Sequence, residues 1–374
     1  MNVLIASGIF PPDIGGPATY VPSLAAALAG RGDAITVVTM SDEPHPDAYP
    51  FRVVRVLRRG GPAARWGAAL RALLRAGRDA EVVYAVGLLP QSAAANLRLR
   101  RPLVARVVGD LAWDRATVYG WTTDDLETFQ VRRHGLRIEV VQAVQHWAIR
   151  RAVRVIVPSE WLASWMRRVG VPPARLRMIP NALAPLPAVH VTRPHAPTPY
   201  LIAMVGRLVP VKRIDLAIRA LRDLPEASLL LIGDGPQRGA LQQLAAELAL
   251  TDRVIFAGAR ARGEMLGMLA GSDALVLCSA HEGFPHVLLE AMSLGVPVIA
   301  TPVRGIVEIV ADGVNGLLLD AATAPALGHA LRVLLADTDR RRELAERARV
   351  DVGRRFRFDT MVDTTRGVLA EAVR

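Results

Sequence analysis

The sequence contains almost no lysine. Of its 46 basic residues, 45 are arginine, and the one lysine is Lys212. A flexible ammonium group and a planar guanidinium are not interchangeable in a binding site. Lys212 lies in the segment VGRLVPVKR (205–213), between a strand-like run and a helix-like run, which is not where a chance surface lysine is expected. The position therefore indicates a function that arginine does not fulfil.

Cysteine and long apolar runs are also scarce. The single cysteine, Cys278, excludes an internal disulfide and fits a reducing compartment. Its place in the apolar run LVLC is typical of a buried small hydrophobe. No uninterrupted apolar stretch reaches the roughly 18 residues of a membrane span. The N-terminus (MNVLIASGIFPP) lacks the basic region and cleavage site of a signal peptide, so we expect a cytoplasmic protein whose chain starts with a strand.

Aromatic residues make up only 5% of the chain, and no DNA- or RNA-binding motif is recognisable. Nucleic acid is therefore not an expected partner. The net charge of +11 is uneven, because residues 1–190 carry 24 basic and 14 acidic residues, against 22 and 21 in residues 191–374. A basic first half indicates an anionic partner, such as a membrane surface or a phosphorylated substrate. An arginine-rich composition without any such partner is the alternative.

Two domains are expected from the length of 374 residues. Apolar strand-like runs alternate with helix-like segments throughout, which predicts an α/β protein with parallel sheets covered on both faces. A proline-rich, non-periodic segment separates the halves. The expected organisation is a first domain over 1–185, a linker over 186–199, a second domain over 200–355 and a final helix over 356–374. The expected strands are 2–6, 34–39, 51–56, 81–85, 103–108 and 153–157, then 200–205, 228–232, 254–257, 274–278, 296–300 and 316–319.

One basic helix is expected over residues 63–78, where arginines alternate with Trp66 and leucines. That composition fits a helix lying on an anionic membrane, and it equally fits a half-buried surface helix. A second basic segment, 146–154, precedes a strand.

The stretch His281–Thr301 (HEGFPHVLLEAMSLGVPVIAT) holds two glutamates, Glu282 and Glu290. Glu282 falls in a loop after a buried strand, and Glu290 falls on the helix that follows. Pro285 suits the first turn of that helix, because its missing N–H has no helical partner there. The free N–H groups of the turn form a site for phosphate. Two carboxylates around an anion-binding helix start would suit a sugar nucleotide.

Two other clusters follow expected strands of the second half. Gly206 and Arg207 come after strand 200–205, with Lys212 close behind, and the turn Gly233-Asp234-Gly235-Pro236 comes after strand 228–232. Ligands of open α/β sheets bind at the carboxyl ends of the strands, so we expect the clusters to converge. Arg207 and Lys212 would hold a pyrophosphate. The glycine turn by itself is equally compatible with an ordinary tight turn.

The first half offers weaker signals. Gly15 and Gly16 follow the first strand without G-x-G-x-x-G spacing, so the dinucleotide fingerprint is absent, although backbone without side chains lets a ligand approach. The loop after strand 103–108 carries Asp110, Trp113 and Asp114, which are expected to be exposed and to contact substrate.

The motifs GRLVPVK, GDGP, EGFPHVLLEAMSLGVPVIAT and EIVADGVNGLLL together resemble the family 4 glycosyltransferases. The resemblance is strong over 200–320 and looser at FPPDIGGPATYV and at PSEWL and IPNA (158–182). It implies a GT-B fold, in which two Rossmann-like domains face each other across a cleft and the final helix crosses back to the first. It also implies retaining transfer of a sugar from a nucleotide-diphosphate sugar, without a metal or another cofactor.

The resemblance further assigns roles to residues. Glu290 would bind the ribose hydroxyls, Glu282 the hydroxyls of the donor sugar, and Arg207 and Lys212 the pyrophosphate. Arg207, Lys212 and Glu282 are the expected catalytic residues. The expected donor-binding residues are Gly15, Gly16, Gly206, Asp234, Gly235, Arg260, Gly283, Phe284, Pro285, His286, Val287 and Glu290. Asp110 and Trp113 are the expected acceptor-binding residues.

The chain departs from the family at one place. Many members carry a histidine after the fifth strand of the first domain, and this chain has Val108 followed by Gly109 and Asp110. Asp110 or the backbone would take over that contact.

The expected acceptor is a lipid-linked or cell-envelope glycan, with the protein at the inner face of the membrane. The alternatives are another GT-B enzyme (a nucleotide-sugar epimerase or a phosphorylase) and an inactive nucleotide-sugar-binding protein. The pair Asp337 and Asp339 is interpreted as solvated rather than metal-binding.

Overall fold

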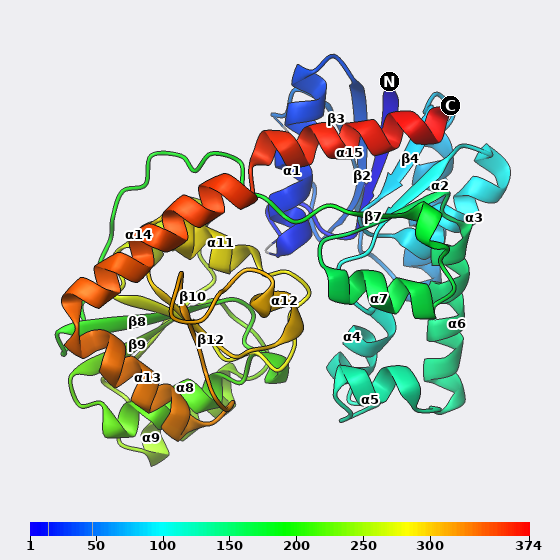
Figure 1. Cartoon of the computed structure of the whole chain (residues 1–374). Helices are drawn as coiled ribbons and strands as arrows, with labels where there is room; N and C mark the ends of the chain where they lie inside the picture. The colour runs from blue at the N-terminus through cyan, green and yellow to red at the C-terminus, as the bar shows by residue number, and fades with distance from the viewer. Residues whose placement is uncertain (14, 47) are drawn as a thin grey trace. The chain divides into compact units, whose positions relative to one another are not determined.

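A computed structural model describes residues 1–13, 15–46 and 48–374 of the chain. The residues group into two compact units (Figure 1). Unit 1 comprises Met1–Asn181 together with Phe358–Arg374, and unit 2 comprises Ala182–Arg357. The end of the chain is therefore part of the unit that contains its beginning.

Unit 1 is built on a parallel sheet of seven strands in the order β3-β2-β1-β4-β5-β6-β7. Strands β1, β2, β4, β5 and β6 are largely buried on both faces, which is why they lack the polar alternation of half-exposed strands, whereas the edge strands β3 and β7 are mostly half-buried. The strands are β1 (Asn2–Ser7), β2 (Ala34–Ser41), β3 (Arg52–Leu57), β4 (Val82–Ala85), β5 (Leu103–Arg106), β6 (Arg154–Val157) and β7 (Leu176–Met178).

Helices cover both faces of this sheet. On one face α2 packs on α3 and α3 packs on α6, whereas α15 packs on α1 (Figure 1). The helices are α1 (Gly16–Gly30), α2 (Pro62–Ala76), α3 (Leu89–Leu99), α4 (Leu111–Val118), α5 (Leu126–Val131), α6 (Leu136–Arg151), α7 (Glu160–Arg168) and α15 (Phe358–Val373), with a 3-10 turn at Pro173–Arg175. None of the helices in the described part of the chain is long and apolar enough to cross a membrane.

Unit 2 contains a parallel sheet of six strands in the order β10-β9-β8-β11-β12-β13. The strands are β8 (Tyr200–Val205), β9 (Ala227–Ile232), β10 (Val254–Gly258), β11 (Ala274–Leu277), β12 (Val298–Ala300) and β13 (Leu317–Leu318). The helices are α8 (Ile214–Ala220), α9 (Arg238–Glu247), α10 (Arg262–Ala270), α11 (His286–Ser293), α12 (Arg304–Val307), α13 (Ala324–Ala336) and α14 (Thr338–Arg355), with 3-10 turns η2 (Pro210–Lys212) and η3 (Leu221–Asp223).

The observed elements follow the expected pattern closely, with four differences. The loop expected after strand 103–108 contains the helices α4 and α5. The short strand β7 was not expected from the sequence. Residues 146–151 of the expected basic segment 146–154 are the end of a longer helix, α6, which begins at Leu136, and Arg154 begins β6. The proline-rich stretch lies against unit 2, because the Thr192 amide donates to Gly267 O at 3.0 Å and Arg193 pairs with Asp273 at 2.9 Å.

Cys278 is fully buried directly after β11. Burial raises the pKa of its thiol to about 12, so the thiol stays protonated at neutral pH. A protonated buried thiol behaves as a small apolar side chain.

Candidate functional site

Three loops meet at the carboxyl edge of the unit 2 sheet, after β8, β9 and β11. Strand β8 lies between the other two, and all three are parallel. The loops after β8 and β9 touch through backbone, since a Cβ on Gly233 (φ 147°) would lie only 1.9 Å from Gly206 O. Glycine at 233 is therefore required both by its backbone conformation and by this close approach. The clusters that were expected to converge are brought together here.

The lone lysine and the first glutamate of this edge form a direct ion pair. Lys212 Nζ lies 2.5 Å from Glu282 Oε1, and the Ser279 hydroxyl donates to the same oxygen at 2.6 Å. Both charged side chains are largely buried, with exposed fractions of 21% for Lys212 and 12% for Glu282. The pair joins η2, which carries Lys212, to the loop after β11, and Lys212 also lines a small pocket near the end of β8. Ser279 was not found from the sequence, where no charge or glycine marks it.

Backbone contacts hold the loop that carries Glu282. The Thr301 hydroxyl donates to Ser279 O at 2.6 Å, and the Ala280 amide donates to Val211 O at 2.8 Å. A Cβ on Gly305 would lie 2.3 Å from Glu282 O, so only glycine allows α12 to approach this closely. These contacts order the loop before any ligand is bound.

Helix α11 begins at His286, with Pro285 as the residue that precedes it. The expectation that Pro285 lies inside the first turn was wrong by one position, because its ψ of 119° is extended rather than helical. No side chain caps this helix start, so its first N–H groups are available to an anion. Phe284 is buried with its ring 5.5 Å from the Phe356 ring, so its side chain anchors the loop in the interior of unit 2.

Glu290 lies on the second turn of α11 and is 4% exposed. Arg262, which begins α10, donates to its Oε1 from Nη2 at 3.0 Å and from Nε at 3.3 Å. Burial raises the pKa of Glu290, and the charge of Arg262 works against that rise. Arg262 was missed in the sequence, although its neighbour Arg260 was selected. The side chain of Arg260 is exposed and donates to Ala257 O at 2.9 Å, and the prediction that its backbone lies beside the base of the donor stays a prediction.

Residues of two further loops that were expected to bind the donor lie at the same edge of the sheet. Gly206, exposed Arg207 and Lys212 line one small pocket at the end of β8. Asp234 accepts from the Gly235 amide at 2.7 Å and pairs with Arg238 at 3.0 Å, so its carboxylate stabilises the turn after β9. The backbone of Gly235 lies close to Leu208, which ties that turn to the β8 loop.

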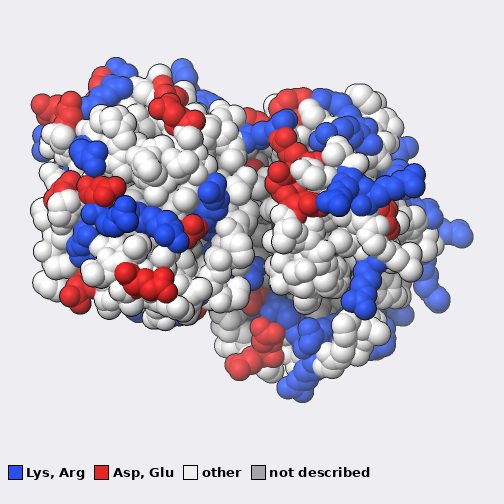
Figure 2. Space-filling model, turned by 90° about the horizontal axis from the view of Figure 1, so that it is seen from below, with Lys and Arg blue, Asp and Glu red and all other residues white. Residues whose placement is uncertain are grey.

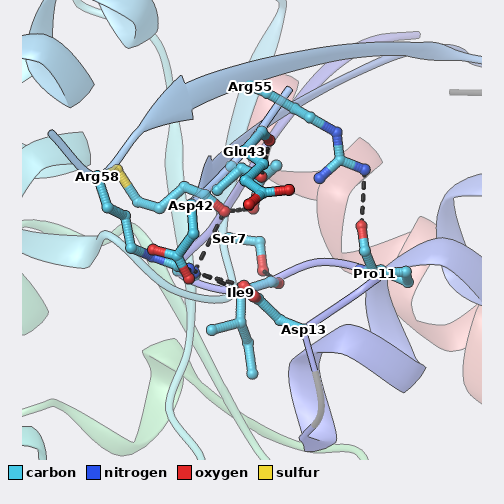
Figure 3. Close-up of polar contacts among 12 residues, drawn as sticks. Ser7, Ile9, Pro11, Asp13, Asp42, Glu43, Arg55 and Arg58 are labelled. Atoms are coloured by element: carbon cyan, nitrogen blue, oxygen red, sulfur yellow. Dashed lines mark hydrogen bonds and ion pairs between the residues drawn. The ribbon is translucent and has the colours of Figure 1, made fainter. Parts of the chain in front are cut away.

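In unit 1, Gly15 and Gly16 stand at the start of α1, after the loop that follows β1. Two arginines from β3 and its end hold this loop (Figure 3). Arg58 pairs with both carboxylate oxygens of Asp13, reaches Gly8 O at 3.3 Å and pairs with Asp42 at 2.9 Å. Arg55 donates to Pro11 O at 2.7 Å. The glycine pair therefore follows a segment that is fastened to the strand edge.

The exposure expected for Asp110 and Trp113 was wrong. They are only 3% and 6% exposed, whereas Asp114 is exposed as expected. Strand β5 ends at Arg106, and Asp110 then caps α4, because its Oδ1 accepts from the amides of Ala112 at 3.0 Å and Trp113 at 3.2 Å. Burial raises the pKa of Asp110 against the effect of these bonds. The Trp113 indole donates to Asp124 O at 3.0 Å, so it too is engaged inside the unit.

The D-x-D pair lies on the surface of unit 2. Asp337 caps α14 by accepting from the Arg340 amide at 2.8 Å, and the Asp339 side chain is 97% exposed. Within residues 1–13, 15–46 and 48–374, no group of three or more His, Cys, Asp or Glu side chains is arranged to hold a metal ion.

Known proteins similar to this chain match both units. Residues 189–351 match the family described as glycosyl transferases group 1, and residues 15–182 match the glycosyl transferase 4-like domain. The GDP-mannose-dependent alpha-(1-6)-phosphatidylinositol monomannoside mannosyltransferase of Mycobacterium tuberculosis is 30% identical over 96% of both chains. The lipopolysaccharide core glycosyltransferase LpsE of Rhizobium meliloti is 33% identical over 52% of this chain, which spans only 58% of that relative.

Solved structures with the same fold cover nearly the whole chain. Anabaena HepE in complex with UDP and glucose has a TM-score of 0.81 at 22% identity, with 99% of both chains covered. WaaG, a glycosyltransferase of lipopolysaccharide biosynthesis, has a TM-score of 0.75 at 19% identity, with 98% of this chain and 99% of that chain covered. At such identities the likeness concerns the fold, two Rossmann-like α/β units. The chain therefore belongs to the group 1 glycosyltransferases of family 4 and has the GT-B fold.

Proposed function

We propose that this protein is a retaining hexosyltransferase that moves a sugar from a nucleotide-diphosphate sugar to an acceptor hydroxyl. The observation that carries the proposal is the Lys212–Glu282 pair at 2.5 Å, placed between the β8 loop and the start of α11. The pair places the Lys212 ammonium, which would bind phosphate, next to the Glu282 carboxylate, which would bind sugar hydroxyls, at the carboxyl edge of the unit 2 sheet.

The donor is held by complementary chemistry along that edge. Glu290, buried and fixed by Arg262, accepts hydrogen bonds from the ribose hydroxyls. The pyrophosphate lies between Arg207, Lys212 and the uncapped N-terminus of α11. Glu282 accepts from hydroxyls of the transferred sugar. The backbone from Gly283 to Val287 meets the phosphate and the sugar, with His286 contributing its backbone.

Charge stabilisation drives the proposed reaction. The bond between the anomeric carbon and the phosphate oxygen breaks, and its electron pair leaves with the nucleoside diphosphate. An oxocarbenium-like state follows, and the acceptor hydroxyl attacks from the face that the phosphate leaves. The hydroxyl proton passes to the departing phosphate, so the proton is accounted for and no separate protein base is required. Arg207 and Lys212 take the part that a metal ion plays in other transferases, because they neutralise the growing negative charge.

The similar proteins support a glycan acceptor near a membrane. One acts on a phosphatidylinositol mannoside and another serves lipopolysaccharide biosynthesis, by their names. We propose a lipid-linked or cell-envelope glycan acceptor and a cytoplasmic protein at the inner face of the membrane. The basic excess of residues 1–190 supports this placement.

The test starts with the donor. A thermal-shift panel of UDP, GDP and ADP sugars identifies the nucleotide, and NMR of the product gives its anomeric configuration, which is expected to match the donor. Transfer or slow hydrolysis is expected to persist in EDTA. Lys212→Ala is expected to lower kcat about 10²–10³-fold, and Arg222→Ala, at an exposed arginine of the same unit, is expected to leave it unchanged. Full activity in Lys212→Ala, or a pyridoxal absorbance band on the purified protein, would contradict the proposal.

A further inference from the structure

The outer face of α6 is apolar where a surface helix is normally polar. Its inner face packs into unit 1 through Ile138, Gln145, Ala148 and Ile149. On the opposite side Leu136, Val140 and Val144 are 81%, 52% and 42% exposed. Residues four apart lie on one face of a helix, so the three form a continuous stripe, which exposed Ala143 and half-buried Trp147 widen. Val131, just before the helix, is 77% exposed as well.

Arginines surround this stripe. From Val131 to Arg151 the chain carries five arginines and one acid, Glu139. Glu139 accepts from the His134 amide at 2.8 Å, so its carboxylate is engaged at the helix start. Within the described residues, Arg133 and Arg137 are exposed and have no ion-pair partner. Figure 2 shows that the right-hand part of the molecule, which is unit 1, carries many basic side chains together with some acidic ones and areas of uncharged surface.

The combination selects one kind of partner. A second copy of the chain would oppose two arginine-rich stripes and repel itself. An anionic bilayer accepts the apolar side chains between its headgroups, while arginines extend along the surface to the phosphates. We propose that the stripe Leu136–Val140–Val144 of α6, with Arg133 and Arg137, is the surface by which this protein lies on an anionic membrane. The inference rests on the proposed function, in which the acceptor is membrane-linked.

Helix α2 is the competing surface. Helix α3 lies between the two surfaces, because it packs on α2 and also on α6. Of the large apolar side chains of α2 only Trp66 is exposed, at 39%, and Arg65 donates to Gly60 O at 2.8 Å. Arg71 and Arg75 of α2 are exposed, as Arg133 and Arg137 are, so the arginines do not distinguish the two helices. The larger number of exposed apolar side chains on α6 is what favours it.

Vesicle flotation of the full-length protein tests the surface. Phosphatidylcholine vesicles are compared with vesicles that contain phosphatidylglycerol, at low and high salt. The variant Leu136→Ser/Val140→Ser/Val144→Ser is expected to lose flotation on anionic vesicles. Arg133→Gln and Arg137→Gln are each expected to weaken it about fivefold, since one basic residue near an anionic surface contributes about 1 kcal/mol. The matched control replaces exposed valines of unit 2, Val191→Ser/Val333→Ser/Val350→Ser, and is expected to float like the parent.

Several outcomes would overturn the inference. These are a parent protein that does not float, a serine variant of α6 that floats normally, or loss of flotation in Trp66→Ala alone. Light scattering also tests whether a second copy covers the face. If the parent protein is a dimer, the α6 variant is a monomer and flotation is the same for both, the face binds a second copy and not a membrane. Hydrolysis of the nucleotide sugar in solution separates this test from the proposed function, because the α6 variants are expected to retain it in full.

Discussion

At the scale of single residues, the site depends on carboxylates that are positioned by cations. Lys212 holds Glu282, and Arg262 holds Glu290, each at hydrogen-bond distance. Lys212 and Glu282 were each selected from the sequence, as the lone lysine and as one of the glutamate pair, but their pairing with each other was not predicted. Arg262 was not selected at all, since it is one arginine among 45, and only the approach of α10 to α11 selects it.

The Arg262–Glu290 contact predicts a change in the pH profile of donor use. Burial raises the pKa of Glu290 and Arg262 opposes the rise, so Arg262→Met is expected to raise that pKa further. A protonated Glu290 accepts ribose hydroxyls poorly. The acidic limb of kcat/KM for the donor is therefore expected to move to higher pH in Arg262→Met, less in Arg262→Lys, and not at all in Arg260→Met. An unchanged limb in Arg262→Met would mean that Glu290 does not bind the donor.

At the scale of elements, loops that look irregular are fixed by strand-edge contacts. The loop after β1 is held by Arg58 and Arg55, which lie on or next to β3 (Figure 3). The loop with Glu282 is held by η2, Thr301 and α12. Within each unit, parallel strands bring the loop to the carboxyl edge of that unit's own sheet, but sequence separation hides which side chains fasten it. The exposure predicted for Asp110 was wrong because its carboxylate caps α4 locally and also accepts from Gln130, which lies 20 residues further along the chain.

Removing the Arg58 side chain tests the first of these loops. Arg58→Ala leaves Asp13 without its partner, and both side chains are about one-fifth exposed. The free energy of unfolding is expected to fall by about 1–3 kcal/mol. Because Gly15 and Gly16 follow this loop, KM for the donor is expected to rise while kcat changes less. Arg58→Lys is expected to recover part of both losses.

The matched control for Arg58 is Arg52→Ala, at the exposed start of the same strand. It is expected to alter neither urea unfolding nor donor KM. If Arg58→Ala lowers stability with donor KM unchanged, the loop has no part in holding the donor.

At the scale of the whole molecule, the chain returns to its first unit through α15. The helix packs on α1, and Arg366 binds the fully buried side chain of Asp33 at 2.7 Å and 3.1 Å. Arg31 pairs with Asp359 and Asp363 at 3.1 Å and 2.8 Å. Unit 1 is therefore complete only with the last residues of the chain.

Asp33 makes the attachment of α15 dependent on pH. Burial alone would raise its pKa, but the hydrogen bonds from Arg366 and from the Met1 amino group outweigh burial and lower it. A lowered pKa in the folded state means that the stabilisation is present above the usual aspartate range and is lost as the pH falls through the lowered pKa. Asp33→Asn is expected to lose about 1–2 kcal/mol near pH 7, and little in strong acid. Urea unfolding of both proteins at several pH values measures this, and a difference that is independent of pH would contradict it.

The sequence by itself determined the strand and helix pattern, the α/β class and the carboxyl edge of unit 2 as the candidate donor site. The spacing of apolar residues, the positions of glycines and the ends of strands can all be read from short stretches of sequence. The rule that ligands bind at the carboxyl edge of a parallel sheet can then be applied without a structure. Only the tertiary structure decided which cations position the carboxylates, that Asp110 is buried, and that α6 exposes an apolar stripe. These depend on which side of each helix or loop meets a neighbour that is distant in sequence, and a local pattern does not contain that information.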